Sequence, residues 1–250
     1  METFALDIPT AVAGVAVCFV AAVLGSVAGM GAGMIVTLFV TPIIGPKAVV
    51  PVMAVLMLIN NASRVWVYRD GLQPGRVAMI AGFAIPASVI GALIYVRLEG
   101  PLVQVLLGVI LIISVPFRRW MVGQAVEPSR GQVAAVSGLY GFLSAIVVGA
   151  GMLIIPILMG LGLAGPALLA TDAAIAVLVN ITKVILYGSL DALSLQFFAL
   201  AVVMGLCTVP GTWVGAWVVR RTSVRIHNVM IETLIVAGGL WLLWGGLRSG

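Results

Sequence analysis

Long stretches without a charged residue limit the possible folds of this chain more than any other feature of its sequence. Each stretch is long enough to cross the roughly 30 Å hydrocarbon core of a bilayer, which takes about 20 apolar residues as an α-helix. Only 8% of the residues are charged and 62% are hydrophobic, whereas about a quarter of the residues of a soluble domain are charged. A soluble fold is therefore excluded. The stretches lie between Asp7 and Lys47, Arg76 and Arg97, Glu99 and Arg118, Arg130 and Asp172, and Asp191 and Arg220.

Glycine, proline and charged residues divide the apolar runs into segments that we expect to be helices. The first run follows Glu2 and Asp7 without a lysine or arginine, so it lacks the positive start of a signal peptide and we expect it to be a helix of the mature protein. The expected second and seventh helices are too short to span a bilayer. The expected helices are Ile8 to Leu24, Met34 to Ile44, Lys47 to Tyr68, Gly75 to Arg97, Pro101 to Phe117, Gly131 to Val148, Met152 to Leu161, Pro166 to Gly188, Leu195 to Arg220 and Ile226 to Gly245.

The second half of the sequence repeats motifs of the first half in the same order. Repeated halves are typical of secondary transporters, whose binding sites lie where the two repeats meet. We therefore expect an N-terminal transmembrane repeat over residues 1–120, a cytoplasmic linker over 121–130 and a C-terminal transmembrane repeat over 131–250. The matched motifs are Gly31-Ala32-Gly33-Met34 with Gly149-Ala150-Gly151-Met152, Gly45-Pro46 with Gly165-Pro166, Asn61 to Val65 with Asn180 to Val184, and Pro86 to Ala92 with Pro210 to Ala216.

The positions of the arginines predict how the two halves are oriented. Basic loops stay on the cytoplasmic side of a membrane. The loop after the third expected helix is basic, with Arg69 and Arg76, but its counterpart in the second half holds only Asp191. In the next pair of loops the pattern is reversed, because the basic loop, with Arg220 and Arg221, is the one in the second half. We therefore predict an all-α bundle of inverted halves in the inner membrane, each with a glycine-broken or re-entrant short helix. Broken helices that give four crossings per half remain the alternative.

A glycine-rich segment in each half is the first candidate for a binding site. Gly29, Gly31 and Gly33 precede the first short helix, and Gly149 and Gly151 precede the second. Glycine lowers helix propensity, so the helix is expected to unwind and to expose backbone amides. The positive ends of the half-helices would then attract an anion. The alternative is close helix packing through small residues of the GxxxG type.

The second candidate is a polar face on the third helix of each half. Asn61 and Arg64 share a face at helical spacing, as do Asn180 and Lys183. Polar groups inside a membrane usually face the protein interior or a cavity, and asparagine amides could bind the oxygens of an anion. Alternatively, the two basic side chains extend to the lipid headgroups.

Asp172 is the one carboxylate well inside an expected helix, about 16 Å along the axis from Lys183 and so too far for an ion pair with it. It is a candidate for ion coupling, or it is an acid in the first helical turn that interacts with the helix dipole. The sequence contains no pattern for a zinc site, a P-loop or a dinucleotide, so we expect no metal and no cofactor. The basic residues lie in short loops, so we expect no nucleic-acid partner.

Three motifs resemble those of the TauE/SafE family of sulfite and organosulfonate exporters. They are the glycine-rich segment from Gly25 to Ile35, the Gly-x-Gly-Met-x-x-x-Pro form at Gly149 to Pro156, and the duplicated Pro-x-[Ser/Thr]-x-x-Gly-Ala segments. The resemblance extends over essentially the whole chain. It implies a cytoplasmic-membrane permease for sulfite, sulfoacetate or a related anion, driven by an ion gradient.

The sequence thus favours a non-enzymatic transporter with a small anionic substrate, surrounded by membrane lipid and able to form a homodimer. A second hypothesis is an intramembrane enzyme or an assembly factor that handles a sulfur intermediate. That function would need a reactive residue within the membrane, for which Cys18 and Cys207 are the candidates.

Overall fold

The computed structural model describes residues 8–28, 32–121, 127–219 and 224–249, and within these ranges it contains helices and no strand. The prediction of an all-α fold is confirmed. The α-helices are α1 (Ile8–Ala28), α2 (Ala32–Ile44), α3 (Pro46–Tyr68), α4 (Pro74–Tyr95), α5 (Gly100–Met121), α6 (Arg130–Ser144), α7 (Ile154–Gly160), α8 (Gly165–Ser189), α9 (Leu195–Val219) and α10 (Val224–Ser249), and the 3₁₀ helices are η1 (Arg69–Gly71) and η2 (Ala150–Leu153).

Four segments of the described chain are long and apolar enough to cross a membrane, namely α3 with η1, α4, α8, and residues Leu195–Trp217 of α9. Large hydrophobic side chains also cover the outside of these helices. Ile185 of α8 is 64% exposed and Leu206 of α9 is 57% exposed. An apolar outer surface suits a helix that faces lipid. The chain is therefore a multi-pass helical membrane protein.

Local sequence signals set where several helices begin. Proline stands in the first turn of α3, α4 and α8, where its missing N–H group would have no partner in the helix. Before α6, the hydroxyl of Ser129 accepts a hydrogen bond from the backbone N–H of Gln132, and the side chain of Gln132 accepts one from the N–H of Ser129. This capping box satisfies two donors at the helix start.

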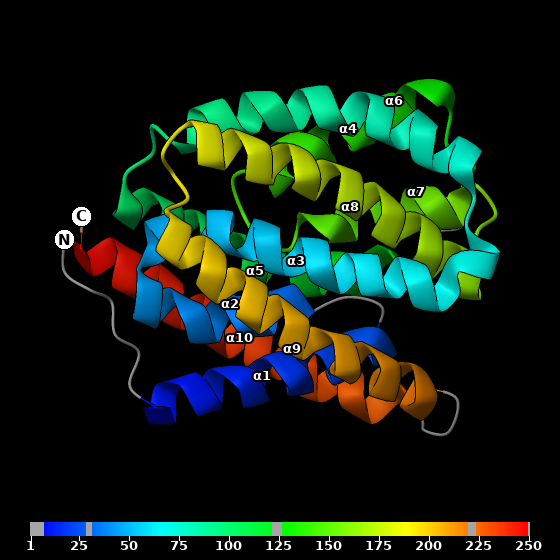
Figure 1. The fold of residues 1–250 in the computed structure, drawn as a ribbon. Helices are drawn as coiled ribbons and strands as arrows, with labels where there is room; N and C mark the ends of the chain where they lie inside the picture. The colour runs from blue at the N-terminus through cyan, green and yellow to red at the C-terminus, as the bar shows by residue number, and fades with distance from the viewer. Residues whose placement is uncertain (1–7, 29–31, 122–126, 220–223, 250) are drawn as a thin grey trace.

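α3 and α8 lie side by side at the centre of the molecule (Figure 1). They run antiparallel, because Gly71 after α3 lies against Ala167 near the start of α8, while Lys47 and Asp191 line a common pocket at the opposite end. Around this pair, α4 packs on α6 and α8, α9 packs on α1 and α3, and α5 packs on α10. The two long helices α3 and α8 thus form the inner layer of the bundle.

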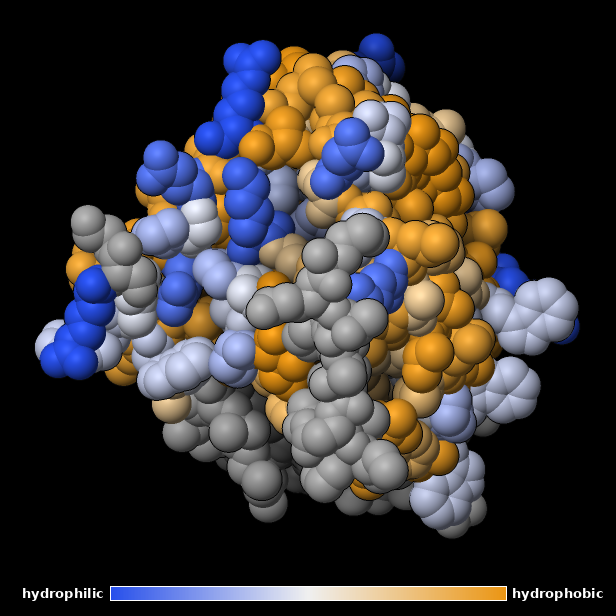
Figure 2. Space-filling view, turned by 60° about the vertical axis from the view of Figure 1, so that its left-hand side comes forward, coloured by the Kyte–Doolittle hydropathy of each residue, from blue (hydrophilic) through white to orange (hydrophobic). Residues whose placement is uncertain are grey.

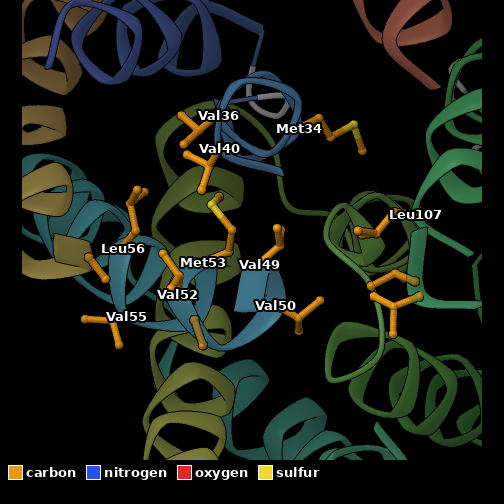
Figure 3. Close-up of a cluster of buried hydrophobic side chains, with 14 of the residues drawn as sticks. Met34, Val36, Val40, Val49, Val50, Val52, Met53, Val55, Leu56 and Leu107 are labelled. Atoms are coloured by element: carbon orange, nitrogen blue, oxygen red, sulfur yellow. The ribbon is translucent and has the colours of Figure 1, made fainter. Parts of the chain in front are cut away.

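The largest hydrophobic cluster holds the N-terminal half of α3 in place. In Figure 3, Val36 and Val40 of α2 point toward α3, where Met53 and Leu56 face them. Each of these four side chains is at most 2% exposed. Close van der Waals packing of this kind holds helices together within a membrane, so this contact fixes α2 against α3.

Glycines let some of the outer helices approach closely. A Cβ atom at Gly211 of α9 would lie 2.9 Å from the side chain of Ala22 of α1, and one at Gly108 of α5 would lie 2.7 Å from the backbone of α10. Real Cβ atoms do not approach other atoms so closely. Close packing is also present at the candidate glycines, since a Cβ atom at Gly33 would lie 3.1 Å from the sulfur of Met57. Gly33 therefore combines close packing with a position beside α3.

The surface of the molecule is divided by polarity. In Figure 2, hydrophilic side chains gather toward the middle and left of the visible face, and hydrophobic side chains cover most of the remaining coloured surface. Apolar surface of this extent, interrupted by a polar region, is the pattern expected of a protein surrounded by lipid.

Candidate functional site

A cavity of about 150 Å³ lies between α2, α3, α6 and α8 and the turn that contains Gly149. Most of the residues singled out in the sequence line it. They are Gly33, Asn61, Arg64, Gly149, Gly151, Asp172, Asn180 and Lys183. Gly29 and Gly31 lie outside the described residues. The cavity brings together segments that are more than 100 positions apart in the sequence.

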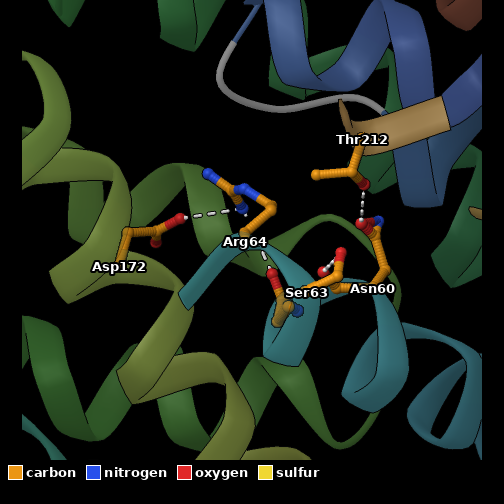
Figure 4. Close-up of polar contacts among 6 residues, drawn as sticks. Asn60, Ser63, Arg64, Asp172 and Thr212 are labelled. Carbon is orange, nitrogen blue, oxygen red and sulfur yellow. Dashed lines mark hydrogen bonds and ion pairs between the residues drawn. The ribbon is translucent and has the colours of Figure 1, made fainter. Parts of the chain in front are cut away.

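Arg64 of α3 reaches across to Asp172 of α8. Its Nη1 atom lies 3.4 Å from Oδ2 of Asp172 and 3.1 Å from Oδ1 of Asn61, and Figure 4 shows the two charged side chains pointing toward each other. The side chains of Arg64 and Asp172 are only 11% and 10% exposed. The alternative expectation that Arg64 extends to the headgroups is therefore wrong.

Asp172 does not lie in the first turn of its helix, as its alternative interpretation required. α8 begins at Gly165 and has no acidic residue in its first turn, so Asp172 lies about two turns further along. At that position it contributes little to the interaction with the helix dipole, which falls off within the first turn. Its position opposite Arg64 instead places a carboxylate inside the cavity.

Lys183 points inward as well. It is 7% exposed, and its Nζ atom donates a hydrogen bond to the backbone carbonyl of Ser144 at 3.0 Å. One turn further along α8, the hydroxyl of Tyr187 donates to the carbonyl of Ala145. Both carbonyls lie at the end of α6, where helix carbonyls lack partners within the helix. Lys183 therefore does not extend to the headgroups.

These two contacts explain why α6 is shorter than expected. The sequence predicted a helix to Val148, but α6 ends at Ser144, because side chains of α8 satisfy its last carbonyls. The chain then turns through Gly149, whose φ of 103° lies in a region that side chains disfavour. Gly151 lies in η2, and the second short helix, α7, starts at Ile154 instead of Met152.

The two asparagines of the cavity, Asn61 and Asn180, differ in their hydrogen bonds. Asn61 accepts the hydrogen bond from Arg64, whereas the side chain of Asn180, which is 5% exposed, has no hydrogen bond within the described part of the chain. Asn180 and Lys183 are three residues apart, so they lie on one face of α8. An amide and an ammonium group thus face the same cavity.

Several lining residues were not singled out in the sequence. Asn60 accepts a hydrogen bond from Thr212 of α9 at 3.3 Å, and Tyr140 and Ser144 of α6 line the cavity. Methionines also contribute to its wall. A signal was present for two of them, since Met34 and Met152 end the repeated Gly-Ala-Gly-Met motif. The lining methionines are Met34, Met53, Met57 and Met152.

The lining residues carry an excess of positive charge. Arg64 and Lys183 contribute two formal positive charges and Asp172 contributes one negative charge, so the described lining has a formal charge of +1. A buried charge is costly unless it is paired, so an unbalanced positive charge favours the entry of an anion. Neither cysteine is among the described residues that line the cavity.

Comparison with known families identified one match. A family model described as "Sulfite exporter TauE/SafE" matches residues 14–242, which is nearly the whole chain. Comparison with curated proteins and with solved structures gave no match.

Proposed function

This chain belongs to the TauE/SafE sulfite exporter family, and we propose that it is a secondary transporter that moves a small sulfur-containing anion across the cytoplasmic membrane. Sulfite, sulfoacetate and other organosulfonates are the candidate substrates. All carry oxyanion groups that accept hydrogen bonds from ammonium, guanidinium and amide donors.

The cavity with its excess positive charge is the observation that supports this function most strongly. Arg64, Lys183 and Asn180 all present N–H donors in a partly open cavity between largely apolar helices. Electrostatic attraction is stronger in such an environment than in water. One negative charge on the substrate balances the lining while Asp172 is ionised, and two balance it once Asp172 is protonated.

The proposed mechanism is alternating access by two inverted halves, residues 1–120 and 131–250. The antiparallel arrangement of α3 and α8 supports it, as does the packing of the surrounding helices. α9 packs on α1, and their counterparts in the other half, α4 and α6, also pack on each other. Rocking of one half against the other around a central site is a common mechanism of repeat transporters.

Asp172 is the proposed coupling group. A substrate anion that approaches Arg64 competes with the carboxylate of Asp172 for the same guanidinium. Among the described residues, the other ionisable groups that line the cavity are Arg64 of α3, Tyr140 of α6 and Lys183 of α8. Protonation of Asp172 would release Arg64 to the anion, so anion and proton would move together. Asp172→Asn should leave flux that no longer responds to a proton gradient.

Flux in proteoliposomes tests the proposed function directly. The wild-type protein should transport sulfite or an organosulfonate with saturable kinetics. The double variant Asn61→Ala with Asn180→Ala should abolish flux while the protein stays folded, because it removes two lining amides. Gln196→Ala, at an exposed position on α9, is the control. Wild-type flux in the double variant would remove the asparagines from the mechanism.

Labelling of introduced cysteines tests the inverted arrangement. Asp70 is fully exposed and Ser189 is exposed at the end of α8, so both sites accept a cysteine, whereas a side chain at Gly71 would meet the backbone of Ala167 at 2.8 Å. In a background without native cysteines, an impermeant maleimide should label Asp70→Cys and Ser189→Cys from opposite sides. Labelling of both from one side would contradict inversion.

A further inference from the structure

We infer that the transported anion binds first at Lys183 and Asn180 of α8, because the position that would supply a carboxylate to Lys183 is occupied by Met53. The inference rests on the proposed transport function and adds the place of the first contact within the cavity. It follows from a comparison of the two basic residues that the repeat brings to the cavity.

Arg64 is already engaged by the protein. Its guanidinium contacts the carboxylate of Asp172 at 3.4 Å and the amide oxygen of Asn61 at 3.1 Å. An anion that binds at Arg64 must displace a carboxylate that is covalently part of the chain. Displacement of a buried partner leaves that partner's charge uncompensated, which is strongly unfavourable.

Lys183 lacks such a partner within the described residues. Lys183 lies 119 positions after Arg64, as Asn180 does after Asn61 (183 − 64 = 119 and 180 − 61 = 119). The same offset before Asp172 leads to position 53 (172 − 119 = 53), which holds methionine. The Gly-Pro motifs at the helix starts are 120 positions apart, so the offset of 119 is taken from the cavity-lining pairs of Asn61 with Asn180 and Arg64 with Lys183. Met53 is among the described residues that line the cavity and its neighbour Val52 is not. The Arg64–Asp172 pair thus corresponds to Lys183 and Met53.

Met53 and Lys183 both line the cavity, and both are buried, with exposed fractions of 2% and 7%. The ammonium group of lysine has three donors. One donates to the carbonyl of Ser144, which leaves two for a ligand. Asn180, three residues earlier on the same face, adds an amide with no protein hydrogen bond in the described chain. An oxyanion group is the ligand that fits these donors.

The competing explanation is that Lys183 only caps α6. A cap needs only a donor to a carbonyl at the helix end, and its loss would lower stability without a specific effect on anion binding. A carboxylate placed at position 53 separates the two roles, because it leaves Lys183 and its hydrogen bond to Ser144 in place. It would occupy the ammonium group as Asp172 occupies Arg64, and a neutral residue of the same size at position 53 controls for the loss of the methionine from the contact with α2.

The experiment measures binding of radiolabelled sulfite to the full-length protein in lipid nanodiscs. Met53→Asp should weaken sulfite binding at least about tenfold, because the new carboxylate would accept a charge-assisted hydrogen bond from Lys183 in place of sulfite. Met53→Asn, which has the same size without the charge, is the matched control for loss of the methionine, and Met53→Asp should bind about tenfold more weakly than Met53→Asn. Lys183→Met should also lose binding, and Lys183→Arg should restore it. Thermal unfolding of each variant identifies any that fail to fold.

The outcomes separate the inference from the proposed function. If the wild-type protein binds neither sulfite nor methanesulfonate, the proposed function fails. If the wild type binds and Met53→Asp binds as tightly as Met53→Asn, the first contact is not at Lys183 and the inference is wrong, while the proposed function stands. Should Met53→Asp not fold, Asn180→Ala takes its place. Wild-type affinity in Asn180→Ala would overturn the inference, and an approximately tenfold loss would support it.

Discussion

Replacing Asp172 with asparagine removes the negative charge opposite Arg64 and leaves a buried guanidinium without its counter-ion. The two groups are 3.4 Å apart and each is about one-tenth exposed. At this distance, with an effective dielectric constant of about 20, the attraction between two unit charges is about 5 kcal/mol. Removal of one partner from a buried pair costs about 3–5 kcal/mol in measured cases.

A double-mutant cycle isolates the interaction of this pair. Asp172→Asn and Arg64→Met should each lower the free energy of unfolding by about 3 kcal/mol or more. The double variant should lose much less than the sum of the two, because the second substitution removes a charge that has already lost its partner. The free energies are measured by SDS-induced unfolding in mixed micelles, with helicity as the readout.

The matched control is the ion pair of Arg69 with Asp70. Nε of Arg69 lies 3.9 Å from Oδ1 of Asp70, but the side chain of Arg69 is 57% exposed and that of Asp70 is 101% exposed. Solvent screens the attraction between such exposed charges. A cycle on this pair should be additive. Additivity within about 0.5 kcal/mol for Arg64 and Asp172 as well would refute the conclusion that they form a stabilising pair across α3 and α8.

Other contacts give further predictions. Tyr187→Phe removes the hydroxyl that donates to a carbonyl at the end of α6 and should lower the free energy of SDS-induced unfolding by about 1–3 kcal/mol. Gly211→Val would place a Cβ atom 2.9 Å from Cβ of Ala22 in α1, whereas a Cβ atom at Gly82 would meet no atom within 4 Å. The first substitution should lower the melting temperature and Gly82→Val should change it much less; equal effects would contradict the close packing of α1 and α9. Thr212→Val removes a hydrogen bond to Asn60 and should lower the free energy of unfolding by about 1 kcal/mol. An unchanged free energy of unfolding would show that this contact does not stabilise the protein.

The helices were predictable because their signals are local. A run of apolar residues bounded by glycine, proline or charge is enough to indicate a membrane helix. The polar faces were also accessible, since Asn61 and Arg64 recur as Asn180 and Lys183 at the same spacing. The repeat drew attention to residues that line one cavity in the structure.

Contacts between distant segments were not predictable in the same way. The sequence shows that Asp172 is too far from Lys183 along α8, but nothing local indicates that it faces Arg64, which is 108 positions away. The predicted end of α6 was wrong for a related reason. The apolar residues from Ala145 to Val148 would continue a helix by hydrophobicity alone, and the side chains that satisfy the last carbonyls of α6 come from α8.

The Arg64–Asp172 pair has a consequence for the energies of the conformational states. A transporter built from two identical inverted halves would have inward-open and outward-open states of equal energy, since a rotation exchanges them. The carboxylate at position 172 has methionine as its counterpart at position 53, so under the proposed inverted arrangement exchange of the two states no longer preserves the charge interactions and the two states differ in energy. The empty protein would then rest in one of its two states, and substrate would enter predominantly from one side of the membrane.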